Sequence, residues 1–160
     1  MAASVQSQAS RRSGQRLLWQ LPLWVYRLGL NCLLGEYQLL LSLVGQEDGK
    51  DYRALLDIIG KEPDGSAYYA VAAQDESAAW YRALMDHPKA TIVIGRQQLQ
   101  ALAARLPFEE ALSWLRGFAW SQPVAYRALL QKAHLPYDDS EAGLQAAARR
   151  LLVFKFKILP

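Results

Sequence analysis

The feature that most constrains the fold is a succession of short apolar segments bounded by turn residues. Glycine- or proline-containing turns separate several of these segments, as expected between β-strands. In the last of them apolar side chains alternate with Lys155 and Lys157, the period-two pattern of a strand with one solvated face. The predicted strands cover residues 37–44, 52–60, 67–73, 90–94, 98–105 and 153–158.

Helical signals are fewer, and most of them come late in the chain. The predicted helices cover residues 22–34, 77–86, 107–122, 124–132 and 140–150, with Asp139 or Ser140 as the cap of the last. This order lacks the strand–helix–strand alternation of a doubly wound parallel sheet. We therefore predict an α+β fold, a small antiparallel split β-barrel of about six strands. Barrel closure removes exposed strand edges, and the N-terminal and C-terminal helices then pack outside.

Charge is distributed unevenly along the 160 residues. Residues 1–16 hold three arginines and no acid, whereas residues 17–160 hold 15 basic and 15 acidic side chains. The length suits one domain, so we predict a flexible basic tail over 1–16 and a single barrel domain over 17–160. Because the body is neutral and shows no basic cluster, we expect no nucleic-acid partner.

The apolar run after the tail fits neither a signal peptide nor a membrane span, because Pro22 and Arg27 interrupt it. A lone cysteine, Cys32, excludes an internal disulfide and suits a reducing compartment. We therefore expect a cytoplasmic protein. The tail arginines with Trp19 and Trp24 also suit weak peripheral contact between the N-terminal helix and anionic lipid at the inner membrane face.

The motifs of common catalytic centres are missing. His87 and His134 stand 47 positions apart. The chain has no His-Glu-x-x-His pair, no Gly-x-Ser-x-Gly elbow and no nucleotide-binding glycine fingerprint. Asp138 and Asp139 fit a helix cap better than a catalytic carboxylate pair. The residues thus predict no metal site and leave any catalytic group unknown.

One collinear set of features indicates a family. An apolar helix and a strand precede the segment Gly-Gln-Glu-Asp-Gly-Lys at 45–50. Two strands, a Trp-Tyr-Arg helix segment at 80–82, a β-branched strand and a Gly-Arg turn at 95–96 follow. In this order the chain resembles the deazaflavin-dependent nitroreductase family, a branch of the flavin-type split β-barrels, over residues 21–160. The resemblance implies an enzyme that moves a hydride from a reduced deazaflavin to quinones, nitroaromatics or other acceptors.

The same resemblance implies a cofactor and a set of contacts. The cofactor is an 8-hydroxy-5-deazaflavin coenzyme, with FMN as the alternative, and its anionic tail lies near the glycine loop. Five tryptophans and eight tyrosines supply material for an apolar slot around its ring. Tyr126 and Tyr137 are candidate proton donors. The implied cofactor-binding residues are Gly45, Gly49, Lys50, Arg53, Ser77, Trp80 and Arg82.

The glycine loop departs from the family pattern in its charge. Gln46 and Glu47 stand where the family has two basic residues, and Asp48 stands in place of a serine. With Asp51, three carboxylates face two cations, so the local charge is about −1. A carboxylate 4 Å from a phosphate opposes it by about 1 kcal/mol in water-like surroundings and about 4 kcal/mol near a protein surface.

Two alternatives to a deazaflavin reductase follow from this departure. In one, the barrel has lost the coenzyme and serves as a non-catalytic binding module. In the other, it binds FMN, haem or another apolar ligand. Trp80 and Tyr81 then pack in the core, while Lys50 and Arg53 belong to a solvated hairpin face. The sequence sets neither the electron acceptor nor the oligomeric state.

Overall fold

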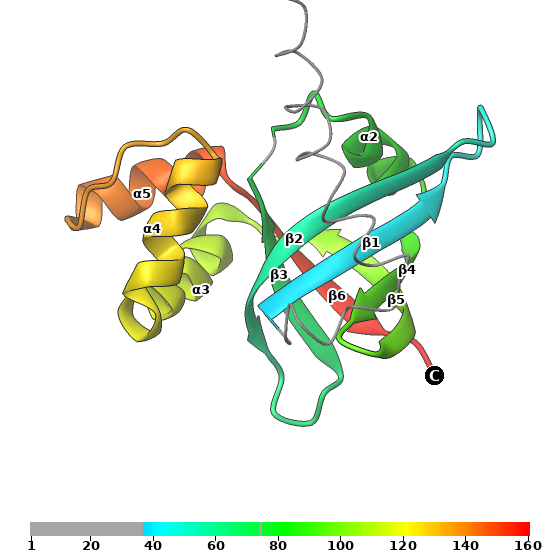
Figure 1. The fold of residues 1–160 in the computed structure, drawn as a ribbon, viewed down its shortest axis with the longest axis horizontal. Coiled ribbons are helices and arrows are strands. Elements are labelled where there is room, and N and C mark those ends of the chain that lie inside the picture. The colour runs from blue at the N-terminus through cyan, green and yellow to red at the C-terminus, as the bar shows by residue number, and fades with distance from the viewer. Residues whose placement is uncertain (1–36, 74) are drawn as a thin grey trace, which may run out of the picture.

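The computed structural model describes residues 37–73 and 75–160, and these form a closed antiparallel barrel with helices outside it (Figure 1). The strand order is β1-β2-β3-β6-β5-β4, and β4 pairs back onto β1. The predicted α+β barrel is confirmed, with every predicted strand within one residue of its observed bounds. The strands are β1 (Gln38–Val44), β2 (Asp51–Lys61), β3 (Ala67–Ala72), β4 (Lys89–Ile94), β5 (Gln97–Arg105) and β6 (Leu152–Ile158).

The described helices follow the local signals in the sequence. Pro123 occupies the first turn of α4, where a missing backbone N–H costs nothing. Of the two predicted caps of the last helix, Ser140 serves, because its hydroxyl accepts the Gly143 N–H at 3.1 Å. The described helices are α2 (Ala79–Asp86), α3 (Phe108–Ser121), α4 (Pro123–Lys132) and α5 (Glu141–Arg150).

The basic tail, Cys32 and the predicted helix at 22–34 lie outside the described residues. Membrane contact through that helix therefore stays a prediction. Within residues 37–73 and 75–160, each helix is too short or too polar to cross a membrane.

Two apolar clusters lie on opposite faces of the strands. Because successive side chains of a strand alternate, Phe154 and Phe156 of β6 point into the barrel while Val153 points out. The inner cluster is closed by Trp80 and Leu84 of α2. The outer cluster lies under α3, α4 and α5, which gather on one side of the barrel, apart from α2 (Figure 1).

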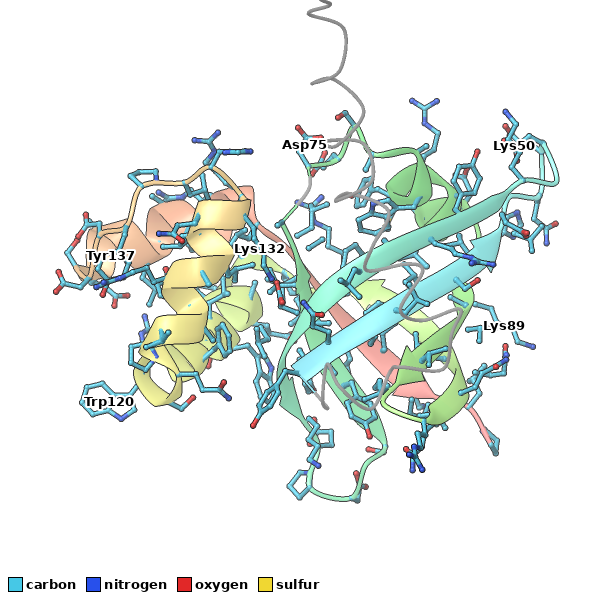
Figure 2. All side chains as sticks on the ribbon, in the orientation of Figure 1. Lys50, Asp75, Lys89, Trp120, Lys132 and Tyr137 are labelled. Carbon is cyan, nitrogen blue, oxygen red and sulfur yellow. The ribbon has the colours of Figure 1, made fainter. Side chains whose placement is uncertain are left out.

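The helical layer meets the barrel at Gly60 on β2. The rings of Tyr69 and Trp114 stack with centroids 3.9 Å apart, and a Cβ on residue 60 would meet the Trp114 ring. A second link is an ion pair from α4 to β2, in which Lys132 Nζ lies 2.9 Å from Asp57 Oδ1 (Figure 2). The absence of a side chain at residue 60 therefore lets the indole of α3 lie flat against the sheet.

We expect Gly60→Ala to lower the free energy of unfolding by about 1–3 kcal/mol, the usual cost of overpacking. Urea denaturation measures this change. Gly117→Ala in α3 is the matched control, because a Cβ there meets nothing within 4 Å. Alanine in that helix should raise stability by roughly 0.5–1 kcal/mol. Equal effects of the two substitutions would contradict this account of the packing.

Candidate functional site

A cavity of about 130 Å³ lies between the β1–β2 hairpin loop and α2. It is smaller than the roughly 300–1,000 Å³ of ordinary ligand sites, so it can take part of a three-ring coenzyme, with the rest outside it. Arg105 helps to hold the α2 region, because its guanidinium donates to the Tyr81 hydroxyl at 2.8 Å and pairs with Glu76. The cavity is lined by Gly45, Gln46, Glu47, Asp48, Tyr52, Ala79, Arg82, Ala83, Asp86 and His87.

The charges around this cavity are mixed, with an excess of carboxylates. Glu47, Asp48 and Asp86 face Arg82 and His87. In the part of the chain that the structure describes, no group of three or more His, Cys, Asp or Glu side chains is placed to hold a metal ion. The cavity therefore offers one guanidinium, an imidazole and small apolar helix residues to a ligand.

The hairpin loop is closed by its own backbone. The Gly45 N–H donates to the Lys50 carbonyl at 2.8 Å, and the Gly49 N–H donates to the Gly45 carbonyl at 2.9 Å. Gly49 has a φ of 64°, in the left-handed region that favours glycine. A Cβ on Gly45 would collide with the Asp48 carboxylate and lie 2.7 Å from the Tyr52 ring. Both glycines are thus required by the loop's own fold.

Asp48 is the acceptor around which this loop is organised. The Tyr52 hydroxyl donates to its Oδ2 at 2.6 Å, and the Lys50 N–H donates to its Oδ1 at 3.1 Å. The Lys50 ammonium lies 3.9 Å from Oδ2. The hydrogen bond from Tyr52 is the main cause that lowers the pKa of Asp48, and the same bond raises the pKa of Tyr52. Asp48 is therefore ionised near neutral pH, and Tyr52 is a poor proton donor.

The loop in this conformation does not fit the anionic tail of a deazaflavin coenzyme. A phosphate is held by free backbone N–H groups and by cations. Here the N–H groups of Gly45, Gly49 and Lys50 all donate within the loop, and the Lys50 ammonium faces Asp48. A phosphate at this position would meet a carboxylate in place of donors.

The structure brings some of the predicted cofactor residues together. Gly45 and Arg82 line the cavity from opposite sides. Gly49 and Lys50 belong to the same loop, but the Lys50 side chain lies at the hairpin tip (Figure 2), where it is 75% exposed and pairs with Asp48. Arg53 follows on β2 and is exposed.

Trp80 and Ser77 lie apart from that cavity. Trp80 is 5% exposed inside the barrel cluster, with its ring centroid 5.9 Å from that of Phe154. Ser77 lines a different cavity, of about 360 Å³, between the segment before α2 and the end of α4. Its hydroxyl and its N–H both donate to Asp75 Oδ1. Whether the predicted residues bind a cofactor stays a prediction, and the fold divides them among four environments: the cavity beside α2, the exposed hairpin, the barrel interior and the second cavity.

The two candidate proton donors lie in the helical layer. Tyr126 packs edge-on against Phe118, and burial raises the pKa of its phenol, whose oxygen has no hydrogen-bond partner among the described residues. The Tyr137 ring faces the Arg127 guanidinium at 4.3 Å. Neither tyrosine lines the cavity beside α2, so the geometry gives no support to a proton-donor role there.

The Asp48–Tyr52 pair was not evident in the sequence. An aspartate two residues before a backbone N–H is a common turn signal, and the Lys50 contact follows that rule. The contact with Tyr52 depends on the hairpin register, which places Tyr52 opposite Leu43. Only the folded hairpin shows that the carboxylate accepts hydrogen bonds through both of its oxygens.

Comparison with known proteins addresses the fold. No protein-family model and no curated protein sequence matches the chain. Among solved structures, the F420-H2 dependent reductase FDR-A matches with a TM-score of 0.51 and 20% identity, over 77% of this chain and 96% of that one. This chain has the fold of that reductase. The fold implied by the resemblance to deazaflavin-dependent enzymes is thus confirmed.

Two further structures share the architecture. One, described as a domain-swapped dimer, has a TM-score of 0.52 and 19% identity over 91% of this chain and 100% of that one. The other, an FAD-binding protein from Mesorhizobium loti, has a TM-score of 0.50 and 14% identity over 82% and 89% of the two chains. At these identities the similarity is evidence for a shared fold, the barrel with its helices.

We expect Asp48→Asn to lower the pKa of Tyr52 toward its ordinary value of 10.0, because it removes the charge that holds the phenolic proton. A titration of ¹³C-labelled tyrosine followed by NMR measures this change. Asp51→Asn is the control, since it removes an equal charge from the start of β2 while leaving the Asp48 contact in place. A similar change in both variants would refute the specific bond as the cause.

Proposed function

We propose that the chain is a flavin-type redox-coenzyme-binding barrel that acts as a deazaflavin-dependent reductase. The observation that carries this proposal is the closed six-stranded barrel with a cavity beside α2, on a fold shared with a protein named as an F420-H2 dependent reductase and another named as FAD-binding. The preferred coenzyme is the 8-hydroxy-5-deazaflavin, which is F420, with one edge of its ring in the cavity and its anionic tail away from the hairpin loop, and FMN is the alternative.

The cavity suits one edge of a flat ring. Ala79 and Ala83 leave space along α2, and Arg82 lies beside them without an ion-pair partner among the described residues. A guanidinium is well matched to planar groups, because it stacks on rings and donates to carbonyl oxygens in one plane. Arg82 is therefore the cation that we assign to the ring edge.

Such a coenzyme supplies the hydride itself when it is bound, so the protein's part is to bind it, orient it and select the acceptor. The missing catalytic triad is then no obstacle to a reductase. The acceptor in this proposal is a small molecule.

A second function is favoured by two observations. The barrel interior is filled by its own side chains, including Trp80, Phe154 and Phe156, and the loop donors are used internally. Both suit a non-catalytic binding module that has lost the coenzyme. Coenzyme binding separates the two functions directly.

We expect the purified protein to bind reduced deazaflavin or FMN with a Kd in the micromolar range or below, measured by parallel fluorescence titrations. The absorbance spectrum of the protein as isolated reveals any flavin or haem that co-purifies. No binding of either coenzyme at high concentration would reject the reductase and favour the binding module.

A substitution in the cavity tests the location of the ring. Ala79 is exposed and lines the cavity, so Ala79→Phe fills the space while leaving the core intact. We expect it to weaken coenzyme binding by at least about tenfold, a loss of about 1.4 kcal/mol. Ala146→Phe is the matched control, because Ala146 is exposed on α5 and lines none of the cavities described above. Equal affinities in the two variants would place the ring elsewhere.

A further inference from the structure

The donors of the hairpin loop beside the cavity already contact an anionic group, the side-chain carboxylate of Asp48. The Asp48 carboxylate accepts hydrogen bonds from the Lys50 N–H and the Tyr52 hydroxyl, and it forms an ion pair with the Lys50 ammonium at 3.9 Å. These are an amide, a neutral hydroxyl and a cation, the donor types that proteins use to bind a phosphate. The donors and the cation with which this loop could bind an external anion therefore already contact Asp48.

Asp48 differs from an ordinary exposed aspartate because its carboxylate packs against a glycine that has no side chain. The carboxylate lies over Gly45, where any side chain at residue 45 would collide with it. Gly45 is buried although the loop around it is exposed. The carboxylate is thus fixed by contacts from three directions, and it lines the cavity between the loop and α2.

A ligand that enters this cavity meets a fixed negative charge at the end formed by the loop. Like charges that approach within a few ångströms repel, and the repulsion is stronger near a protein surface than in water. Glu47 and Asp86 line the same cavity and add to the repulsion, whereas Arg82 lies on the helix side.

We propose that Asp48 is a specificity residue: an internal anion that closes the loop to phosphate, so that a flavin-type ligand binds more weakly when its phosphate lies at the loop than when an uncharged end lies there. The choice of flavin-type ligands rests on the proposed function, but the closure of the loop to phosphate does not.

The first test compares riboflavin with FMN, which differ by one phosphate. We expect the wild-type protein to bind riboflavin at least about tenfold more tightly than FMN. Asp48→Ser removes the carboxylate and frees the Lys50 N–H, so it should tighten FMN binding by about tenfold and change riboflavin binding by less than about twofold. Asp51→Ser is the matched control and should leave the ratio unchanged. Tighter FMN binding by the wild-type protein, or equal gains in both variants, would overturn the proposal.

The second test needs no flavin. Inorganic phosphate is titrated into ¹⁵N-labelled protein, and the amide signals of Gly49 and Lys50 are followed by NMR. We expect them to shift in Asp48→Ser and to stay unchanged in the wild-type protein and in Asp51→Ser. If no variant binds either flavin, the proposed function fails and this titration alone decides the loop's role. Shifts of these amide signals in the wild-type protein, or no shifts in Asp48→Ser, would refute the proposal that Asp48 closes the loop to phosphate. Circular dichroism melts confirm that each variant is folded.

Discussion

The structure depends on the pairing of β4 with β1, which closes the sheet. An open sheet of these strands would expose β1 and β4 as edges, whereas closure pairs residues 39–42 of β1 with residues 91–94 of β4. Closure also fixes which side chains are inside. Leu39 and Leu41 of β1 and Ile92 of β4 become fully buried against Phe154 and Phe156 of β6. Helix α2 contributes Trp80 and Leu84 to this inner core, whereas α3, α4 and α5 pack on the outside of the barrel.

A barrel filled by its own side chains must hold ligands at its margin. Trp80 and Leu84 use one face of α2 to close the interior, which leaves Arg82 and Asp86 of the same helix at the surface. The cavity forms where that polar face meets the first hairpin. This division explains why a short helix can contribute to stability and to a binding surface at once, with residues two positions apart in the chain.

The hairpin loop shows how proteins with one fold can differ in the ligands that they bind. Its glycines serve the backbone geometry of the turn, as seen in the left-handed conformation of Gly49 and the close approach of Asp48 to Gly45. They would be needed whether or not the loop bound an anion. The charge of the side chains between them is a separate property, so the fold can be kept while the chemistry at the loop changes.

Local patterns in the sequence determined the elements. Alternation around Lys155 and Lys157 predicts β6, and Ser140 caps α5, because both signals act over a few residues. The glycines at 45 and 49 likewise predict a turn. Tertiary structure alone decided that Trp80 lies inside the barrel and that Ser77 lines a different cavity from Gly45. It also decided that Tyr52 reaches Asp48, since that contact follows from strand register. The reason is physical: pairing and packing between distant segments depend on which arrangement buries all apolar faces together, and no single segment carries that information.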